Sequence, residues 1–178
     1  LSSMRAYLSL RVSPQCDPPS VINSLKKAGR LAWSSPLIER SLRMASSGHP
    51  PSIPGYQEGS VTPQTESSMI VGLMASSVYS GGPVLDMCTG RGVKAFQFLE
   101  KKTREFLEGW DLSGLRIAAA QREAARLGIP RDRFLLRSGD ALAMEPHTPP
   151  RLVLLDAPCS GSGTWARHPD GKLRFSPD

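Results

Sequence analysis

The first fifty residues combine an alternating apolar pattern with a helical one. Leu8 and Leu10 alternate with polar residues, as they would in a half-buried strand. Pro18 suits the first turn of a helix, and Gly29 suits its end. The expected elements are a strand at 8–12, a helix at 18–28, and short strands at 31–33 and 42–44. Residues 1–50 therefore predict a small α/β element.

A segment rich in proline, glycine and serine follows, between residues 46 and 63. Such a composition is typical of the boundary between two folding units. We therefore expect a linker at 51–64 and a second domain over 65–178, which is long enough to bury a core of its own.

From residue 65 onward, apolar runs typical of strands alternate with longer helical patterns. Thr65 is a candidate N-cap for the first helix. The expected inner face of this helix comprises Met69, Ile70, Leu73, Met74 and Val78. The other expected elements are strands at 83–88, 106–111, 133–137 and 151–156, and helices at 93–104 and 113–127. Strands that alternate with helices of this length form βαβ units, so the predicted fold class is α/β with a parallel sheet and flanking helices.

Four aspartates fall at the ends of the expected strands. They are Asp86, Asp111, Asp140 and Asp156. In parallel α/β sheets, ligands bind where the strands end. A single aspartate at a strand end carries little information, but its recurrence at consecutive strand ends favours one shared binding site.

The turn after the first of these strands, DMCTGRGVKA, places Gly90 and Gly92 before a helix. Glycines there allow a tight turn and let a ligand approach the backbone N–H groups of the helix. The Gly-x-Gly-x-x-Ala spacing also fits a dinucleotide fingerprint, with Asp111 as the ribose acid. Asp86 favours S-adenosylmethionine over NAD, because a carboxylate attracts an ammonium group and repels a pyrophosphate. Both cofactors, and a turn that binds no ligand, remain open on this pattern.

Two of the acids and one cysteine have specific expected roles. Asp111 would accept hydrogen bonds from both hydroxyls of a ribose, and Asp140 would accept one from an adenine amino group. Cys159 follows the last expected strand, close to the glycine turn. A thiolate at that place is a candidate nucleophile, but free cysteine is equally typical of a small buried residue.

The net charge of +6 favours a polyanionic partner such as nucleic acid, although an ordinary basic protein has the same balance. Arg116, Arg122 and Arg126 share one helical face, which we expect to be solvated. The chain has no run of eighteen apolar residues, so no membrane span is expected. Its three cysteines form no zinc-binding pattern, so we expect no metal and a reducing cytoplasmic compartment.

Three stretches together resemble one family. DMCTGRGVKA, DLSGLRIAAAQREAARLG and DAPCSGSGTWARHPD are similar to motifs of the Fmu/Sun family of S-adenosylmethionine-dependent RNA cytosine-5 methyltransferases. The family's small N-terminal RNA-binding element is similar to LSLRV together with the helix ending KKAG. The segment that leads into the family's catalytic domain is similar to GSVTPQTESS. The resemblance implies a Rossmann-like methyltransferase core, an S-adenosylmethionine cofactor and an RNA partner, with ribosomal RNA ahead of transfer RNA.

The resemblance also implies roles for individual residues. Around the cofactor it places Asp86, Cys88, Gly90, Gly92, Lys94, Asp111, Arg116, Asp140 and Asp156. The first four surround its methionine part, whereas Arg116 contacts either cofactor or RNA. Asp156 also holds the cytosine and Cys159 assists release of the product, so these two are the expected catalytic residues. In the family, a second cysteine in a later TCS-type motif is the nucleophile.

This chain departs from the family pattern in two ways. The glycine turn of the family usually reads A-A-P-G-G-K-T, but here Arg91 replaces proline and Val93 replaces glycine. The sequence also ends at Asp178, after the fourth expected strand and before the later cysteine motif. We therefore expect a core truncated after that strand, which lacks the nucleophile. A non-catalytic module that binds RNA or cofactor, or an NAD-dependent oxidoreductase, remains an alternative.

Overall fold

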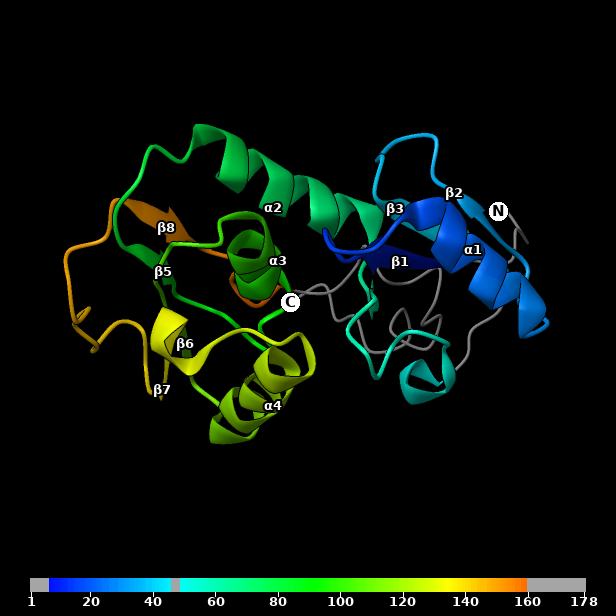
Figure 1. Ribbon diagram of the computed structural model, residues 1–178. Coiled ribbons are helices and arrows are strands. Elements are labelled where there is room, and N and C mark those ends of the chain that lie inside the picture. Colours follow the sequence, from blue (N-terminus) through cyan, green and yellow to red (C-terminus); the bar gives the residue numbers. More distant parts are fainter. Residues whose placement is uncertain (1–6, 46–48, 160–178) are drawn as a thin grey trace, which may run out of the picture.

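The computed structural model describes residues 7–45 and 49–159 and contains two four-stranded sheets (Figure 1). The first sheet has the order β2-β3-β1-β4, and all of its strand pairs are antiparallel. Its unit is built from β1 (Leu8–Val12), α1 (Pro18–Lys27), β2 (Ala32–Ser34), β3 (Ser41–Met44), a 3-10 turn (Pro50–Ser52) and β4 (Val61–Pro63). The expected strand, helix and two short strands are therefore all present.

The structure does not show a linker over 51–64. Val61, within that range, pairs with Val12 of β1 as part of β4, and both residues are buried in the core of the first unit. Ile53 is buried in the same core. The composition suggested a linker because proline and glycine also make the tight turns that return the chain to its own sheet. The first unit consequently extends to Pro63.

The second sheet has the order β7-β6-β5-β8, and all of its strand pairs are parallel. Its unit comprises α2 (Glu66–Val78), β5 (Val84–Asp86), α3 (Val93–Lys101), β6 (Leu107–Asp111), α4 (Gly114–Arg126), a 3-10 turn (Arg131–Arg133), β7 (Phe134–Ser138) and β8 (Leu152–Leu154). Phe96, Phe98 and Leu107 lie in the core between this sheet and its helices. The predicted parallel sheet with flanking helices is confirmed.

Helix α2 begins as predicted but turns a different face inward. The Thr65 hydroxyl accepts a hydrogen bond from the Ser68 N–H, as an N-cap does. Of the predicted inner face, Met69 is buried, whereas Ile70, Met74 and Val78 are exposed. The buried positions besides Met69 are Glu66, Gly72, Ala75 and Ser76. Most of these buried residues are small. The prediction was based on the large apolar residues of the helix, so it chose the wrong side.

Glycine at position 72 lets α2 approach α3 closely. A Cβ atom at Gly72 would lie 2.3 Å from Oε1 of Gln97, which is too close for any side chain. The Gln97 amide donates a hydrogen bond of 2.9 Å to the carbonyl of Met69. Close helix packing of this kind selects small residues, so the side of α2 that carries them faces the core.

A buried polar network joins the two units. Arg11 of β1 forms an ion pair with Glu100 of α3, and both side chains are less than a tenth exposed. The Arg11 Nε donates to Gln64 at 2.8 Å, and the Gln64 amide donates to Gln97 at 2.7 Å. Burial lowers the pKa of Arg11 to about 10, so this guanidinium still carries its charge at neutral pH.

Arg126 of α4 forms a second connection between the units. Its guanidinium lies 4.1 Å from the centre of the Tyr56 ring and donates a hydrogen bond of 2.7 Å to Thr62. Glu123 pairs with the same guanidinium at 2.6 Å. The expectation of a solvated arginine face on this helix is therefore wrong for Arg126, which fixes α4 to the first unit. In the described part of the chain, no helix is both long and apolar enough to cross a membrane.

Replacing Glu100 with alanine is predicted to destabilise the protein by about 3 kcal/mol, because Arg11 would keep a buried charge without its counterion. Urea unfolding followed by circular dichroism measures this change. The double variant Arg11→Met/Glu100→Leu should recover most of the loss, since an apolar pair of similar size needs no solvation. Lys101→Ala, at the exposed neighbouring position of α3, is the control. A cost below about 0.5 kcal/mol for Glu100→Ala would contradict this role.

Candidate active site

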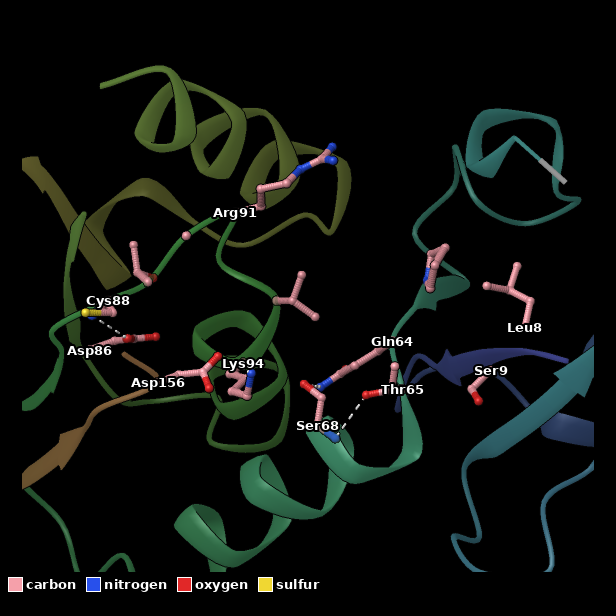
Figure 2. Close-up of a pocket in the computed structure, with 14 residues that line it drawn as sticks. Leu8, Ser9, Gln64, Thr65, Ser68, Asp86, Cys88, Arg91, Lys94 and Asp156 are labelled. Carbon is pink, nitrogen blue, oxygen red and sulfur yellow. Dashed lines mark hydrogen bonds and ion pairs between the residues drawn. The ribbon is translucent and has the colours of Figure 1, made fainter. Parts of the chain in front are cut away.

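A cavity of about 510 Å³ opens at the carboxyl end of β5, where the two units meet (Figure 2). The first unit contributes Leu8, Ser9 and Pro63 to its wall. The second contributes the turn after β5, the start of α3 and Asp156, which follows β8. Side chains from both sheets thus surround one space.

The two glycines of the turn serve different purposes. Both have left-handed backbones, with φ of 57° at Gly90 and 82° at Gly92. A Cβ atom at Gly92 would lie 2.1 Å from the Phe96 ring, so this glycine is required by packing at the start of α3. A Cβ atom at Gly90 would meet nothing within 4 Å. The space beside Gly90 is therefore open to a ligand that approaches the backbone.

Asp86 ends β5 and is only 3% exposed. One of its oxygens accepts a hydrogen bond from the Cys88 N–H at 3.3 Å. Burial raises the pKa of Asp86 to about 6, with a smaller contribution from the nearby carboxylate of Asp156, while Lys94 acts in the opposite direction. A cation bound beside this carboxyl group would favour its ionised form.

Cys88 is held as a thiol. Burial raises its pKa, and the carboxylates of Asp86, Asp111 and Asp156 raise it further. The thiolate is the nucleophilic form of cysteine, so these surroundings make Cys88 a poor nucleophile at neutral pH. Its place in the cavity wall suits contact with a ligand instead.

Asp111 connects the glycine turn to the next strand. Its Oδ2 accepts a hydrogen bond of 3.0 Å from the Gly90 N–H, and its Oδ1 accepts one of 2.8 Å from the Ser113 N–H. The Arg116 guanidinium lies 3.7 Å from Oδ2. The side chain is only 6% exposed, and these contacts hold the carboxylate at the strand end with lone pairs still available to a ligand.

Asp140 lies further along the same edge of the sheet. It follows β7, which pairs with β6 so that Ser138 stands opposite Asp111. The Asp140 carboxylate is exposed and accepts a hydrogen bond of 2.9 Å from the Leu142 N–H. It does not line the cavity described above but stands beyond Asp111, where a ligand that extends along the edge would reach it.

Lys94 and Asp156 form an ion pair in the wall of the cavity, with a distance of 2.5 Å between Nζ and Oδ2. Lys94 comes from the first turn of α3, whereas Asp156 follows β8. The Asp156 side chain is 61% exposed, so it remains accessible from the cavity. Cys159 is exposed three residues further on, and residues 160–178 lie outside the described part of the chain.

The structure brings most of the predicted site residues together. Those that line the cavity are Asp86, Cys88, Gly90, Lys94 and Asp156. Asp111, Arg116 and Asp140 follow on the neighbouring strand ends and the start of α4. Gln64 and Ser68, which also line the cavity, were not predicted as site residues. The resemblance of GSVTPQTESS to a segment before the catalytic domain was the only sequence signal for them.

Comparison with known proteins shows the family of the chain. Residues 77–178 match the family described as 16S rRNA methyltransferase RsmB/F. The chain belongs to this family. The prediction of a Fmu/Sun-type methyltransferase is thereby confirmed at the level of the family, and the family name identifies its members as methyltransferases of ribosomal RNA.

Individual relatives extend the similarity beyond the matched range. The chain is 30% identical over 176 residues to ribosomal RNA small subunit methyltransferase B of Erwinia tasmaniensis, covering 96% of this chain and 40% of the relative. It is 36% identical over 116 residues to the protein of that name from Thermus thermophilus, covering 65% of this chain and 27% of the relative. The chain therefore spans less than half the length of either relative.

Solved structures share the fold. NSun6 from Pyrococcus horikoshii, solved with SFG, has a TM-score of 0.74 at 14% identity, covering 87% of this chain and 64% of that one. A methyltransferase homologue from the same organism has a TM-score of 0.73 at 23% identity, covering 89% and 52%. Together with the parallel sheet described above, they support the predicted Rossmann-like core.

Asp86 should make the stability of the protein depend on pH. The folded state keeps the proton up to about pH 6, whereas the unfolded chain releases it near pH 4, so the free energy of unfolding should fall as the pH rises between these values. Asp86→Asn has no proton to lose, so its free energy of unfolding should not show this fall. Between pH 4 and pH 7, the variant should therefore gain about 2 kcal/mol of stability relative to the wild type. Urea unfolding at several pH values measures it.

Asp132→Asn, which alters an exposed carboxyl group in a surface turn, is the matched control. It should leave the pH profile of the wild type unchanged. Parallel profiles for Asp86→Asn and the wild type would show that Asp86 is not held in its protonated form.

Proposed function

We propose that this chain uses S-adenosylmethionine to methylate carbon 5 of a cytosine in ribosomal RNA. The observation that carries this proposal is the shared cavity, which combines an open glycine turn with the Lys94–Asp156 pair in its wall. The turn suits a cofactor, and the charged pair suits a polar base. The family match supports methyl transfer to ribosomal RNA, while the choice of cytosine and of carbon 5 is our inference.

The residues present fit S-adenosylmethionine. The buried carboxyl group of Asp86 would face the ammonium of the methionine part, and the open side of Gly90 leaves room for the ligand to approach the backbone. Asp111 would accept hydrogen bonds from the ribose hydroxyls, and Asp140 one from the adenine amino group. When bound, the cofactor supplies a methyl group attached to a positively charged sulfur.

Lys94 and Asp156 match the edge of a cytosine. A carboxylate accepts from the amino group on carbon 4 of this base, and an ammonium donates to its carbonyl oxygen. The Lys94 Nζ and Asp156 Oδ2 atoms now lie 2.5 Å apart, so the two side chains would have to separate to hold the base between them. Their opposite charges disfavour uracil, whose carbon 4 carries an acceptor instead of a donor.

Methylation at carbon 5 also requires activation of the ring. A thiolate that adds to carbon 6 breaks the conjugation and makes carbon 5 able to accept a methyl group. A base then takes the carbon-5 proton, and expulsion of the thiolate restores the ring. Cys88 is unsuited to this attack because its pKa is raised. As the resemblance implies, we assign the attack to a cysteine of the later TCS-type motif and the release of the product to Cys159, which is exposed beyond Asp156.

An NAD-dependent reaction is the less favourable alternative. The pyrophosphate of NAD would lie against a turn that carries Asp86 and has Asp111 and Asp156 nearby, and these carboxylates would repel it. The family match to methyltransferases points the same way. A module that binds cofactor without catalysis differs from our proposal only in its failure to transfer the methyl group.

Asp111→Asn should weaken binding of S-adenosylmethionine at least tenfold, because a neutral amide cannot form the charge-assisted hydrogen bonds of about 1.5–3 kcal/mol that a carboxylate makes with ribose. Isothermal titration calorimetry measures the dissociation constant, with Asp132→Asn as the control for an unrelated loss of charge. An unchanged constant in Asp111→Asn would refute the ribose assignment. Binding of NAD by the wild type, without binding of S-adenosylmethionine, would refute the cofactor.

The reaction itself is tested with radiolabelled S-adenosylmethionine and 16S rRNA, on a protein that also carries the later TCS-type cysteine motif. Nuclease digestion followed by mass spectrometry should find 5-methylcytidine, and Asp156→Asn should reduce its yield at least tenfold, because the amide no longer attracts the amino group of the base with a charge. A methyl group on another atom would contradict the choice of carbon 5. Cofactor binding with no labelled RNA would favour the non-catalytic module.

A further inference from the structure

The candidate active site continues into a second, smaller cavity. This cavity of about 110 Å³ lies between the first unit and the start of α3, and it shares Pro63, Arg91 and Val93 with the larger one. Its other lining residues are Pro50, Tyr56, Thr62 and Glu123. The two spaces therefore form one groove, which runs from the Lys94–Asp156 pair past Arg91 to Tyr56.

Arg91 stands at the junction of the two cavities. Its side chain is exposed, and Figure 2 shows it extending away from Asp86, Cys88 and Asp156. Within residues 7–45 and 49–159, it has no hydrogen bond or ion pair to another side chain. A cation in this state is available to an anionic ligand in the groove.

The other cations that face this groove are already neutralised. Lys94 pairs with Asp156, and Arg126, behind the Tyr56 ring, pairs with Glu123. Among the described residues that line the two cavities, Arg91 is thus the cation without a side-chain partner, whereas Glu123 in the smaller cavity is paired with Arg126. Arg91 is also a departure from the turn of the resembled family, which usually has proline at the same position.

We propose that Arg91 binds the phosphate next to the target cytosine, and that the smaller cavity receives part of the adjoining nucleotide of a single-stranded RNA. This inference rests on the proposed function. A base that occupies the larger cavity must leave its stack, and its own backbone then lies at the cavity mouth. Single-stranded nucleic acids are bound by a cationic groove with aromatic side chains along it, and Arg91 and Tyr56 supply both features.

Fluorescence anisotropy with a labelled, unpaired RNA of ten nucleotides that contains one cytosine tests the proposal. Arg91→Ala should weaken binding about fivefold, the effect of one exposed ion pair. It should also lower the slope of log affinity against log salt by about 0.7, the value for one phosphate contact on a single strand. Arg91→Lys should retain most of the affinity, and a duplex of the same sequence should bind more weakly than the single strand.

Arg122→Ala is the matched control, because Arg122 is exposed on α4 and lines neither cavity. It should leave both the affinity and the salt slope as in the wild type. Calorimetry with S-adenosylmethionine serves as a second readout, and Arg91→Ala should bind this cofactor as the wild type does. Reduced cofactor affinity with unchanged RNA affinity would overturn the proposal and assign Arg91 to the carboxylate of the cofactor.

The failure of this inference is distinguishable from the failure of the proposed function. If the wild type binds the RNA and Arg91→Ala binds it with the same affinity and salt slope, the phosphate contact is refuted while the function stands. If the wild type binds S-adenosylmethionine but no RNA, the RNA substrate and the phosphate contact are refuted together.

Discussion

The parallel pairing of β6, β5 and β8 determines where the candidate catalytic groups lie. Asp86 stands opposite Gly109 of β6 and Leu154 of β8, and Ser138 of β7 stands opposite Asp111. Because the strands run in the same direction, the chain leaves each of them at the same edge of the sheet. A shift of one residue in any pairing would turn these carboxylates towards the other face.

The first unit converts this edge into an enclosed site. Its β1 and β4 place Leu8, Ser9 and Pro63 opposite the glycine turn. The contact between the units depends on the buried ion pair of Arg11 and Glu100, whose charges would cost several kcal/mol to bury without each other. The position of the first sheet is therefore tied to α3, the same helix that carries Lys94 into the cavity.

Much of the fold could be predicted because local signals were strong. Short-range rules of backbone geometry or ligand binding account for three of these signals. They are the proline at the start of α1, the Thr65 cap of α2 and the aspartates at strand ends. The inner face of α2 and the membership of β4 in the first sheet could not be predicted from local patterns. Both depend on which distant element packs against them, here Gln97 for α2 and β1 for β4.

In the candidate site, too, local motifs could be predicted from the sequence, whereas contacts between distant segments could not. Asp86, Gly90 and Lys94 come from one continuous motif, so the sequence alone placed them together. The involvement of Gln64 depends on the docking of the first unit, and the pairing of Lys94 with Asp156 depends on the position of β8 beside β5. The contact between Lys94 and Asp156 joins residues 62 positions apart, for which no spacing rule exists.

The central claim is that the strand-end edge beside Gly90 and Asp111 binds S-adenosylmethionine. An NMR titration of the isotopically labelled chain with S-adenosylhomocysteine tests it directly. The amide signals of Cys88, Gly90 and Ser113 should shift most, because these N–H groups lie in the glycine turn or donate to the carboxylates that would hold the ligand. Unchanged signals there, or shifts centred on the first sheet, would contradict the account.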